Sequence, residues 1–261
     1  MRSRRASKGA GALGLLALTA TACSGERLGM PEPISVQAER MLQLWQGSWI
    51  AAFAVGGVVW GLIIWAVLFH RKRSDDLPPQ VRYNMPIEIL YTAVPFVIIA
   101  VLFYFTARDE EFVEKTTANP AVTIDVTGYQ WSWQFDYKEK VAGAEKTVAT
   151  VVGVPVAPNG PAAGKPVMVI PSGKTVRIRL HTNDVIHSFW VPALLYKKDV
   201  MPGYTNEFEF TATKLGTYEG RCAELCGVDH SRMLFQLKVV TPEQYATFMA
   251  EAKAKATGGA Q

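Results

Sequence analysis

Residues 220–233 of the chain read GRCAELCGVDHSRM, a run that carries two thiols, an imidazole and a thioether. A second run, DVIHSF at residues 184–189, adds another histidine. Cysteine, histidine and methionine form a soft nitrogen–sulfur donor set, which selects copper over hard cations such as magnesium. The two runs together therefore predict a redox-active metal centre.

The spacing of these donors indicates how many metal ions they hold. Cys222, Cys226, His230 and Met233 lie so close in sequence that one loop between strands must present them, with His187 on a different loop. A mononuclear blue-copper site needs two histidines, one cysteine and a weak methionine, and here there is one cysteine more. Two thiolates can bridge two metal ions, each of which then needs one imidazole. A thioether and a backbone carbonyl between the cysteines supply the weak donors. The spacing predicts a dinuclear copper centre built for electron transfer.

Two other readings of the cluster remain open at this stage. Cys222 and Cys226 could form a disulfide, because an exported domain meets oxidising conditions. That reading leaves His187, His230 and Met233 unexplained. Zinc is the other reading, but a thioether is a poor zinc ligand.

Composition excludes several classes of protein. The chain has 261 residues and a formal net charge of +4, and much of the positive excess lies at the N-terminus and in one short loop. This distribution indicates membrane topology and gives no reason to expect nucleic acid as a partner. Only three cysteines occur, which are too few for a domain built on disulfides.

Residues 1–22 have the features of a signal peptide. A basic start precedes an apolar run too short to span a bilayer, and residues 18–23 read LTATAC. Small residues before a cysteine resemble a bacterial lipoprotein cleavage site, which would make Cys23 the lipidated N-terminus. Ala20 stands where leucine is usual, so an ordinary signal peptide with an incidental cysteine is the alternative.

Two apolar stretches follow the exterior segment 23–45. No charged residue occurs from Trp49 to Phe69, a stretch about 31 Å long as a helix, and a second apolar stretch runs from Ile89 to Ala107. Pro95 interrupts the second, which membrane helices tolerate. We expect transmembrane helices at 46–70 and 87–107; the alternative is a pair of buried helices in a soluble protein.

The loop between these stretches, residues 71–86, orients the pair. It carries Arg71, Lys72, Arg73 and Arg82, so the positive-inside rule places it in the cytoplasm. Everything after residue 108 then lies outside the cytoplasm, in agreement with the export signal.

Residues 108–241 change character and predict an all-β domain. Short alternating segments are separated by the turn signals PNG, PSG, MPG and LG, a pattern typical of a β-sandwich or barrel. We expect strands at 122–127, 167–170, 175–180, 206–211 and 233–240, and a hairpin or long loop within 138–166. Pro242 and Glu243 open a terminal helix within 242–261.

With these features in place, the chain resembles subunit II of haem–copper cytochrome c oxidases over nearly its whole mature length. The resemblance rests on the apolar helix pair, on GYQWSWQF at 128–135, DVIHSF at 184–189 and KDVMPG at 198–203, and on the run 222–233. It implies a cupredoxin fold, a Greek-key β-barrel or sandwich, that bears the dinuclear copper centre called Cu(A). The implied copper ligands are His187, Cys222, Cys226, His230, Met233 and the main-chain carbonyl of Glu224.

The resemblance also implies roles for three further side chains. The Glu224 carboxylate would reach a magnesium ion at the interface with the catalytic subunit, whereas the plainer reading is a solvated loop glutamate. Trp131 would accept electrons from cytochrome c; alternatively Trp131 and Trp133 are both core aromatics, since alternation places them on the same face. Glu88 would mark the mouth of a proton path, although it could equally lie in headgroup water.

The function that the resemblance implies is electron transfer in a bacterial cell membrane. The chain would accept electrons from cytochrome c and pass them to haem in subunit I, for reduction of O2 to water coupled to proton pumping. Subunits I and III are the expected partners. A lipoprotein-like signal suggests an actinobacterial enzyme, in which the donor is either soluble or part of a bc complex, and the latter allows a supercomplex.

Some features depart from the family pattern or fit other families. Tyr204 stands where many relatives have arginine, and Ser132 replaces an aromatic residue.

A membrane-anchored copper chaperone for oxidase assembly is the alternative function, but it would need an α/β pattern around the cysteines. A quinol-oxidase subunit II would lack the copper ligands, and a nitrous-oxide reductase is much longer and has no such helix pair.

Overall fold

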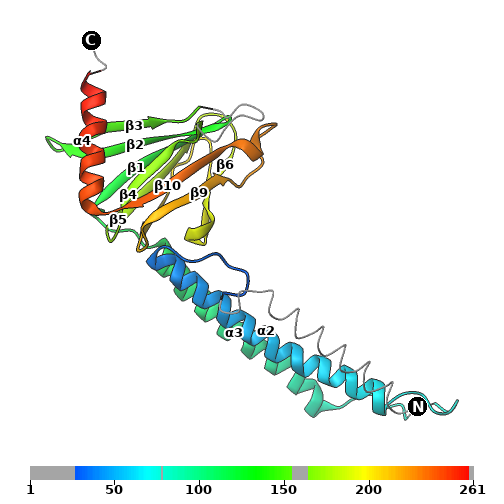
Figure 1. Cartoon of the computed structure of the whole chain (residues 1–261). Coiled ribbons are helices and arrows are strands. Elements are labelled where there is room, and N and C mark those ends of the chain that lie inside the picture. The colour runs from blue at the N-terminus through cyan, green and yellow to red at the C-terminus, as the bar shows by residue number, and fades with distance from the viewer. Residues whose placement is uncertain (1–26, 78, 155–163, 259–261) are drawn as a thin grey trace, which may run out of the picture. The chain divides into compact units, whose positions relative to one another are not determined.

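The computed structural model describes residues 27–77, 79–154 and 164–258 (Figure 1). The described chain falls into two compact units, of which Gln43–Phe112 is one and the remainder the other. The predicted signal peptide at 1–22 and the lipidation site Cys23 lie outside the described residues. The boundaries assigned to the membrane spans and loops stay predictions.

The unit Gln43–Phe112 is helical and contains most of two long helices. Helix α2 spans Val36–Phe69 and helix α3 spans Met85–Glu114, and both are long and apolar enough to cross a membrane. Their apolar side chains are largely exposed, as expected of helices that meet lipid or partner subunits. Residues of both helices line a cavity of about 290 Å³ near Gly47 and Phe105, so the two helices lie side by side there.

Side chains satisfy free backbone groups at both helix starts. The Ser35 hydroxyl accepts a hydrogen bond from the Ala38 amide at 3.1 Å, which makes Ser35 the cap of α2. At α3, the Asn84 amide donates to Glu88 Oε1 at 2.9 Å. The Glu88 carboxylate therefore has a local role at the start of α3, a role that the sequence reading did not include.

The second unit contains two five-stranded β-sheets. In the first sheet the strand order is β3 (Ala144–Val152), β2 (Ser132–Val141), β1 (Val122–Tyr129), β5 (Thr175–Thr182) and β8 (Asn206–Thr211). In the second it is β4 (Val167–Pro171), β10 (Leu234–Val240), β9 (Gly216–Cys222), β6 (His187–Val191) and β7 (Tyr196–Val200). Strands β1 and β5 are parallel, as are β4 and β10, and the other neighbours pair antiparallel. This architecture confirms the predicted apolar helix pair followed by a cupredoxin-like β-sandwich.

The core lies between the two sheets. Strand β1 alternates buried and half-buried residues, so Val122, Ile124 and Val126 face the core. Trp133 from β2 packs edge-on against Phe189 of β6 and Phe235 of β10, at centroid distances of 5.8 and 5.4 Å. These rings connect the two sheets, because Trp133 belongs to the first sheet and both phenylalanines belong to the second.

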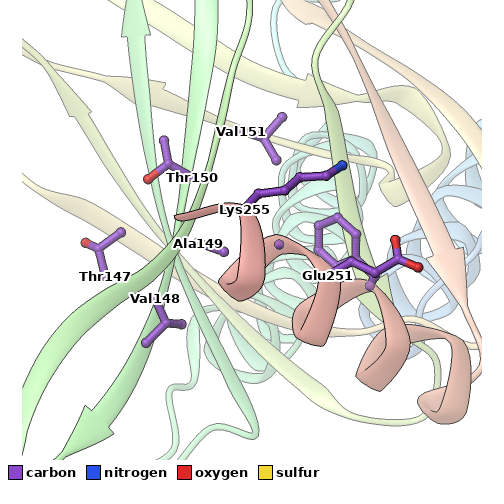
Figure 2. A pocket seen from close by; sticks show the side chains of 9 residues that line it. Thr147, Val148, Ala149, Thr150, Val151, Glu251 and Lys255 are labelled. Carbon is purple, nitrogen blue, oxygen red and sulfur yellow. The ribbon is translucent and has the colours of Figure 1, made fainter. Parts of the chain in front are cut away.

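A terminal helix, α4 (Pro242–Gly258), occurs within the predicted range and packs against the sandwich. The Phe248 ring lies 5.5 Å from the Tyr137 ring, and Met249 is buried. A groove of about 460 Å³ separates α4 from the edge strand β3, with Glu251 and Lys255 on the helix side (Figure 2). None of the predicted metal ligands lines this groove.

Candidate metal centre

The predicted ligands come from two neighbouring strands and one loop of the second sheet. Cys222 is the last residue of β9, and Met233 immediately precedes β10. The loop between them contains Cys226 and a short helical turn, η3 (His230–Arg232). One loop thus presents this group, as predicted. The expectation of a second loop for His187 was wrong, because this residue begins β6.

Strand pairing explains how His187 reaches the cysteines. Strands β6 and β9 are antiparallel, with Phe189 opposite Cys222. The Ala223 amide donates to the Ser188 carbonyl at 3.0 Å, which extends the pairing to the end of the strands. His187 therefore lies beside the cysteine loop although it is far away in sequence.

The two thiols form the middle of the cluster. Cys222 Sγ and Cys226 Sγ are 3.8 Å apart and are not bonded to each other. Cys222 Sγ is 3.9 Å from His187 Nδ1, and Cys226 Sγ is 3.5 Å from His230 Nδ1. Each thiol thus has one imidazole beside it. The sequence-based prediction, one imidazole for each of two metal ions bridged by both thiolates, stays a prediction.

Each thiol also has a weak donor beside it. Met233 Sδ lies 3.8 Å from Cys226 Sγ, and the main-chain carbonyl oxygen of Glu224 lies 3.2 Å from Cys222 Sγ. A metal–thiolate bond is about 2.3 Å long, so a metal ion between the sulfurs can contact both. The donor set is soft and duplicated, and it fits a pair of copper ions better than a hard cation.

Four of the predicted ligands are buried, and His230 is half-buried. His187 and Met233 are 0% exposed, and Cys222 and Cys226 are 4% and 3% exposed. Among the described residues, His187, Cys222 and Cys226 form a group whose ligand atoms all lie within 4.8 Å of one another. The Glu224 side chain, in contrast, is exposed.

The two thiols differ in acidity. Burial opposes ionisation of Cys222, but hydrogen bonds with His187 and with the backbone of Glu224 lower the pKa of this thiol to about 7. Burial and the adjacent Cys222 raise the pKa of Cys226 to about 12. Burial disfavours a charged His187, yet Cys222 and Asp184 raise the pKa of its imidazole. Metal binding must therefore displace protons from this cluster.

Asp184 is a further candidate site residue, which the sequence analysis quoted only as part of a motif. Its Oδ1 lies 2.8 Å from His187 Nε2. A carboxylate on Nε2 leaves Nδ1, the atom that faces Cys222, free to bind metal, an arrangement common at metal sites. The spacing Asp-x-x-His was the available signal for this contact.

The structure separates the two tryptophans that alternation placed on one face. Trp133 is fully buried, and its indole nitrogen lies 3.4 Å from the Met233 carbonyl oxygen. Trp131 lies in the turn between β1 and β2, half-buried, and donates to the Cys226 carbonyl at 3.0 Å. The expectation of a shared face was wrong because the turn at 130–131 interrupts the strand alternation.

Two glycines allow close packing around the ligands. A Cβ at Gly128 would lie 3.2 Å from His187 Cδ2, and one at Gly227 would lie 3.0 Å from Trp131 Cζ2. Gly227 also has a φ of +123°, which favours glycine. Both positions sit in motifs that the sequence reading quoted without assigning them a role.

Comparison with known proteins identifies the family. The chain is 48% identical to the probable cytochrome c oxidase subunit 2 of Streptomyces avermitilis, over 94% of this chain and 86% of that protein. The chain belongs to the cytochrome c oxidase subunit II family. The family model for the periplasmic domain of cytochrome c oxidase subunit II matches residues 122–240. As a subunit II, the chain is part of a haem–copper oxidase complex, an oxidoreductase with partner subunits in a membrane.

Two further relatives were found. Cytochrome c oxidase subunit 2 of Mycobacterium bovis is 38% identical over 92% of this chain and 79% of that protein. The crystal structure of the periplasmic domain of cytochrome oxidase subunit II from Bradyrhizobium japonicum is 34% identical, with a TM-score of 0.44. It covers 54% of this chain and 99% of its own.

Membership of the subunit II family bears on the alternative function considered from the sequence, that of a copper chaperone. Cys222 ends strand β9 and Cys226 lies in the loop before strand β10 of a β-sandwich, so the α/β surroundings that a copper chaperone needs do not occur there. The chaperone alternative is therefore not favoured. The two apolar helices indicate a membrane anchor, and the match to a periplasmic domain indicates an extracytoplasmic site for the sandwich.

Proposed function

We propose that this chain accepts electrons from a cytochrome c and passes them to haem in subunit I, where O2 is reduced to water with proton pumping. The observation that carries the proposal is the paired donor set: each of two buried thiols has one imidazole and one weak donor beside it. Such duplication suits two like metal ions and leaves no donor unused.

The residues that would hold copper are His187, Cys222, Glu224 through its main-chain carbonyl, Cys226, His230 and Met233. Two copper ions bound there would supply a one-electron redox couple shared between the metals. The chain contributes rigidity, because four of these donors are buried and the neighbouring strands are hydrogen-bonded. A rigid set of donors changes little when an electron arrives, which favours fast transfer.

We propose Trp131 as the residue that receives the electron from cytochrome c. Its indole lies in the β1–β2 turn, partly exposed, and donates to the carbonyl of the ligand Cys226. A partly exposed ring one hydrogen bond from a ligand residue offers a short path inward. Trp133, which is fully buried, offers no such surface.

We propose that the Glu224 side chain binds magnesium at the interface with subunit I. Its backbone carbonyl faces Cys222, while its side chain is exposed and free to reach a partner. A carboxylate is a suitable ligand for this hard cation. Glu224 would thus serve the copper site through its main-chain carbonyl and the subunit contact through its side chain.

The topology proposed is that of a bacterial membrane protein whose basic loop 71–86 faces the cytoplasm. The sandwich then lies outside, within reach of a cytochrome c that is soluble or belongs to a bc complex in a supercomplex. Subunits I and III complete the oxidase. We include in this proposal the removal of residues 1–22, lipidation of Cys23, and a proton-path role for Glu88.

Replacement of one bridging thiol tests the proposal. In the purified oxidase, Cys226→Ser should remove copper from this subunit and abolish most cytochrome c oxidation, because a hydroxyl is a poor copper ligand. Ser231→Ala, an exposed change in the same loop, is the matched control.

Assembly must be checked separately from electron transfer. A small reductant that feeds electrons directly to haem should still support O2 consumption by the Cys226→Ser complex. Cytochrome c oxidation at the wild-type rate by that complex would contradict the proposal.

A further inference from the structure

Asp184 binds two parts of the site at once. It lies in the short segment between β5 and β6, and its Oδ1 is 2.8 Å from His187 Nε2. Its Oδ2 accepts a hydrogen bond of 2.7 Å from the backbone amide of Gln130, in the β1–β2 turn. One carboxylate therefore contacts a metal ligand and the turn that carries Trp131.

The carboxylate is held in a single orientation. The Thr182 hydroxyl donates to Oδ1 at 2.8 Å, and the Val185 amide donates to the same oxygen at 2.6 Å. With Gln130 on the other oxygen, rotation of the Asp184 side chain would break several hydrogen bonds together. Its position is thus fixed by its surroundings before any metal binds.

The β1–β2 turn also contacts the other half of the ligand set. Gln130 Nε2 and Trp131 Nε1 both donate to the Cys226 carbonyl, at 2.9 and 3.0 Å. His187 comes from β6 and Cys226 from the β9–β10 loop. The turn is thereby joined to one ligand through Asp184 and to another through a backbone carbonyl.

We propose that Asp184 is a positioning residue that fixes the His187 ring and the β1–β2 turn as one unit. The inference rests on the proposed function. It concerns how the β1–β2 turn, which would meet the electron donor, is held in a fixed position relative to the copper ligands. Movement of the turn when a donor docks would be transmitted to His187 through this carboxylate. The turn and the ligand then keep a constant distance during electron transfer.

The chemistry at this position requires a carboxylate. Both oxygens of Asp184 accept hydrogen bonds, and asparagine has only one acceptor oxygen. In an Asp184→Asn variant, the amide NH2 must face either the Gln130 amide or the His187 ring, so one of the two contacts is lost. The variant keeps the shape of the side chain, so it tests the contacts and not the packing.

The experiment uses the intact oxidase with three changes in this chain: Asp184→Asn, Asp184→Glu and Asp136→Asn. Asp136 is the matched control, a carboxylate in β2 that accepts hydrogen bonds from Gln134 and Thr150 at 2.8 and 2.6 Å. The measurements are copper retained against a chelator, the histidine nitrogen hyperfine couplings, and the rate of electron uptake from cytochrome c by copper-loaded enzyme.

We expect Asp184→Asn to weaken copper retention about 10- to 100-fold, the usual effect of losing a partner of a metal-bound histidine. One nitrogen coupling should change and electron uptake should slow, while Asp136→Asn matches wild type. Asp184→Glu, which restores the charge and both acceptors, should recover part of the copper retention.

Two outcomes would overturn the inference. Wild-type copper retention and nitrogen couplings in Asp184→Asn would remove the role toward His187. Altered couplings with an unchanged rate of electron uptake would show that the ligand and the turn are not joined. A wild-type complex without copper in this subunit would instead refute the proposed function, which keeps the two failures distinguishable.

Discussion

At the scale of single residues, Trp131 and Trp133 show how one turn gives neighbouring indoles different surroundings. Trp133 packs inside the sandwich against Phe189 and Phe235. Trp131 lies against Gly227 and donates to the Cys226 carbonyl. The first position belongs to stability and the second to the metal loop.

This division predicts separate effects of two matched substitutions. Trp131→Phe should slow electron uptake from cytochrome c while the copper spectrum stays intact, because Gln130 still donates to the Cys226 carbonyl. Trp133→Phe should lower the unfolding temperature instead, because it leaves a void in the core. Rapid-mixing kinetics and thermal unfolding measure the two effects; unchanged electron uptake in Trp131→Phe would remove its proposed role.

Glu88 presents a choice between a structural and a functional role. Its carboxylate accepts a hydrogen bond from the Asn84 backbone amide at the start of α3. Glu88→Gln keeps an acceptor oxygen there, so the helix start should be retained while the ionisable group is lost. We expect oxidase turnover to fall, as measured by O2 consumption across a range of pH. Wild-type turnover at every pH would leave Glu88 with only its capping contact.

The candidate ligands could be named from the sequence, and their hydrogen-bond partners could not. Cysteine, histidine and methionine are recognisable donors by residue type, so residue type and spacing were enough to propose Cys222, Cys226 and His230 as ligands. Asp184 and Gln130 are ordinary polar residues, and their contacts depend on how β1, β2 and β6 meet. A single sequence carries no direct signal for such cross-strand contacts.

At the scale of elements, alternation predicted some strands and missed others. Strand β5 has alternating half-buried and buried residues and was predicted within two residues of its end. Strand β6 is short, and four of its five residues are buried, so it has no polar–apolar period to detect. Strands β6 and β9, which are among those missed, carry His187 and Cys222.

The pairing of β9 with β10 sets the relative positions of Cys222 and Met233, which gives a prediction for Gly220. A Cβ at this position would lie 2.2 Å from Phe235 Cζ, so the ring would have to move. Gly220→Ala should destabilise the sandwich by about 1–3 kcal/mol and weaken copper retention. Thermal unfolding with copper analysis measures both.

A neighbouring position supplies the control for this change. Thr217→Ala lies on the same strand at an exposed position and should unfold like wild type. An unchanged unfolding temperature in Gly220→Ala would show that Phe235 accommodates the methyl group, and that the register of β9 and β10 is not limited by this contact.

At the scale of the whole molecule, the chain combines an apolar helix pair with a β-sandwich. The composition of each part predicts its class, because long uncharged helices suit a bilayer and alternating strands suit a sandwich. The sequence alone could not assign strand order, since neighbours such as β1 and β5 are distant in the chain. The metal centre depends on that order, as its ligands come from segments far apart.

The central claim is that this chain holds two coppers which share one electron. The most direct measurement is copper analysis with electron paramagnetic resonance on the full-length chain, purified in detergent without haem subunits and loaded with copper. The account predicts two coppers per chain and one unpaired electron with hyperfine splitting from two equivalent copper nuclei. One copper per chain, with splitting from a single nucleus, would contradict it.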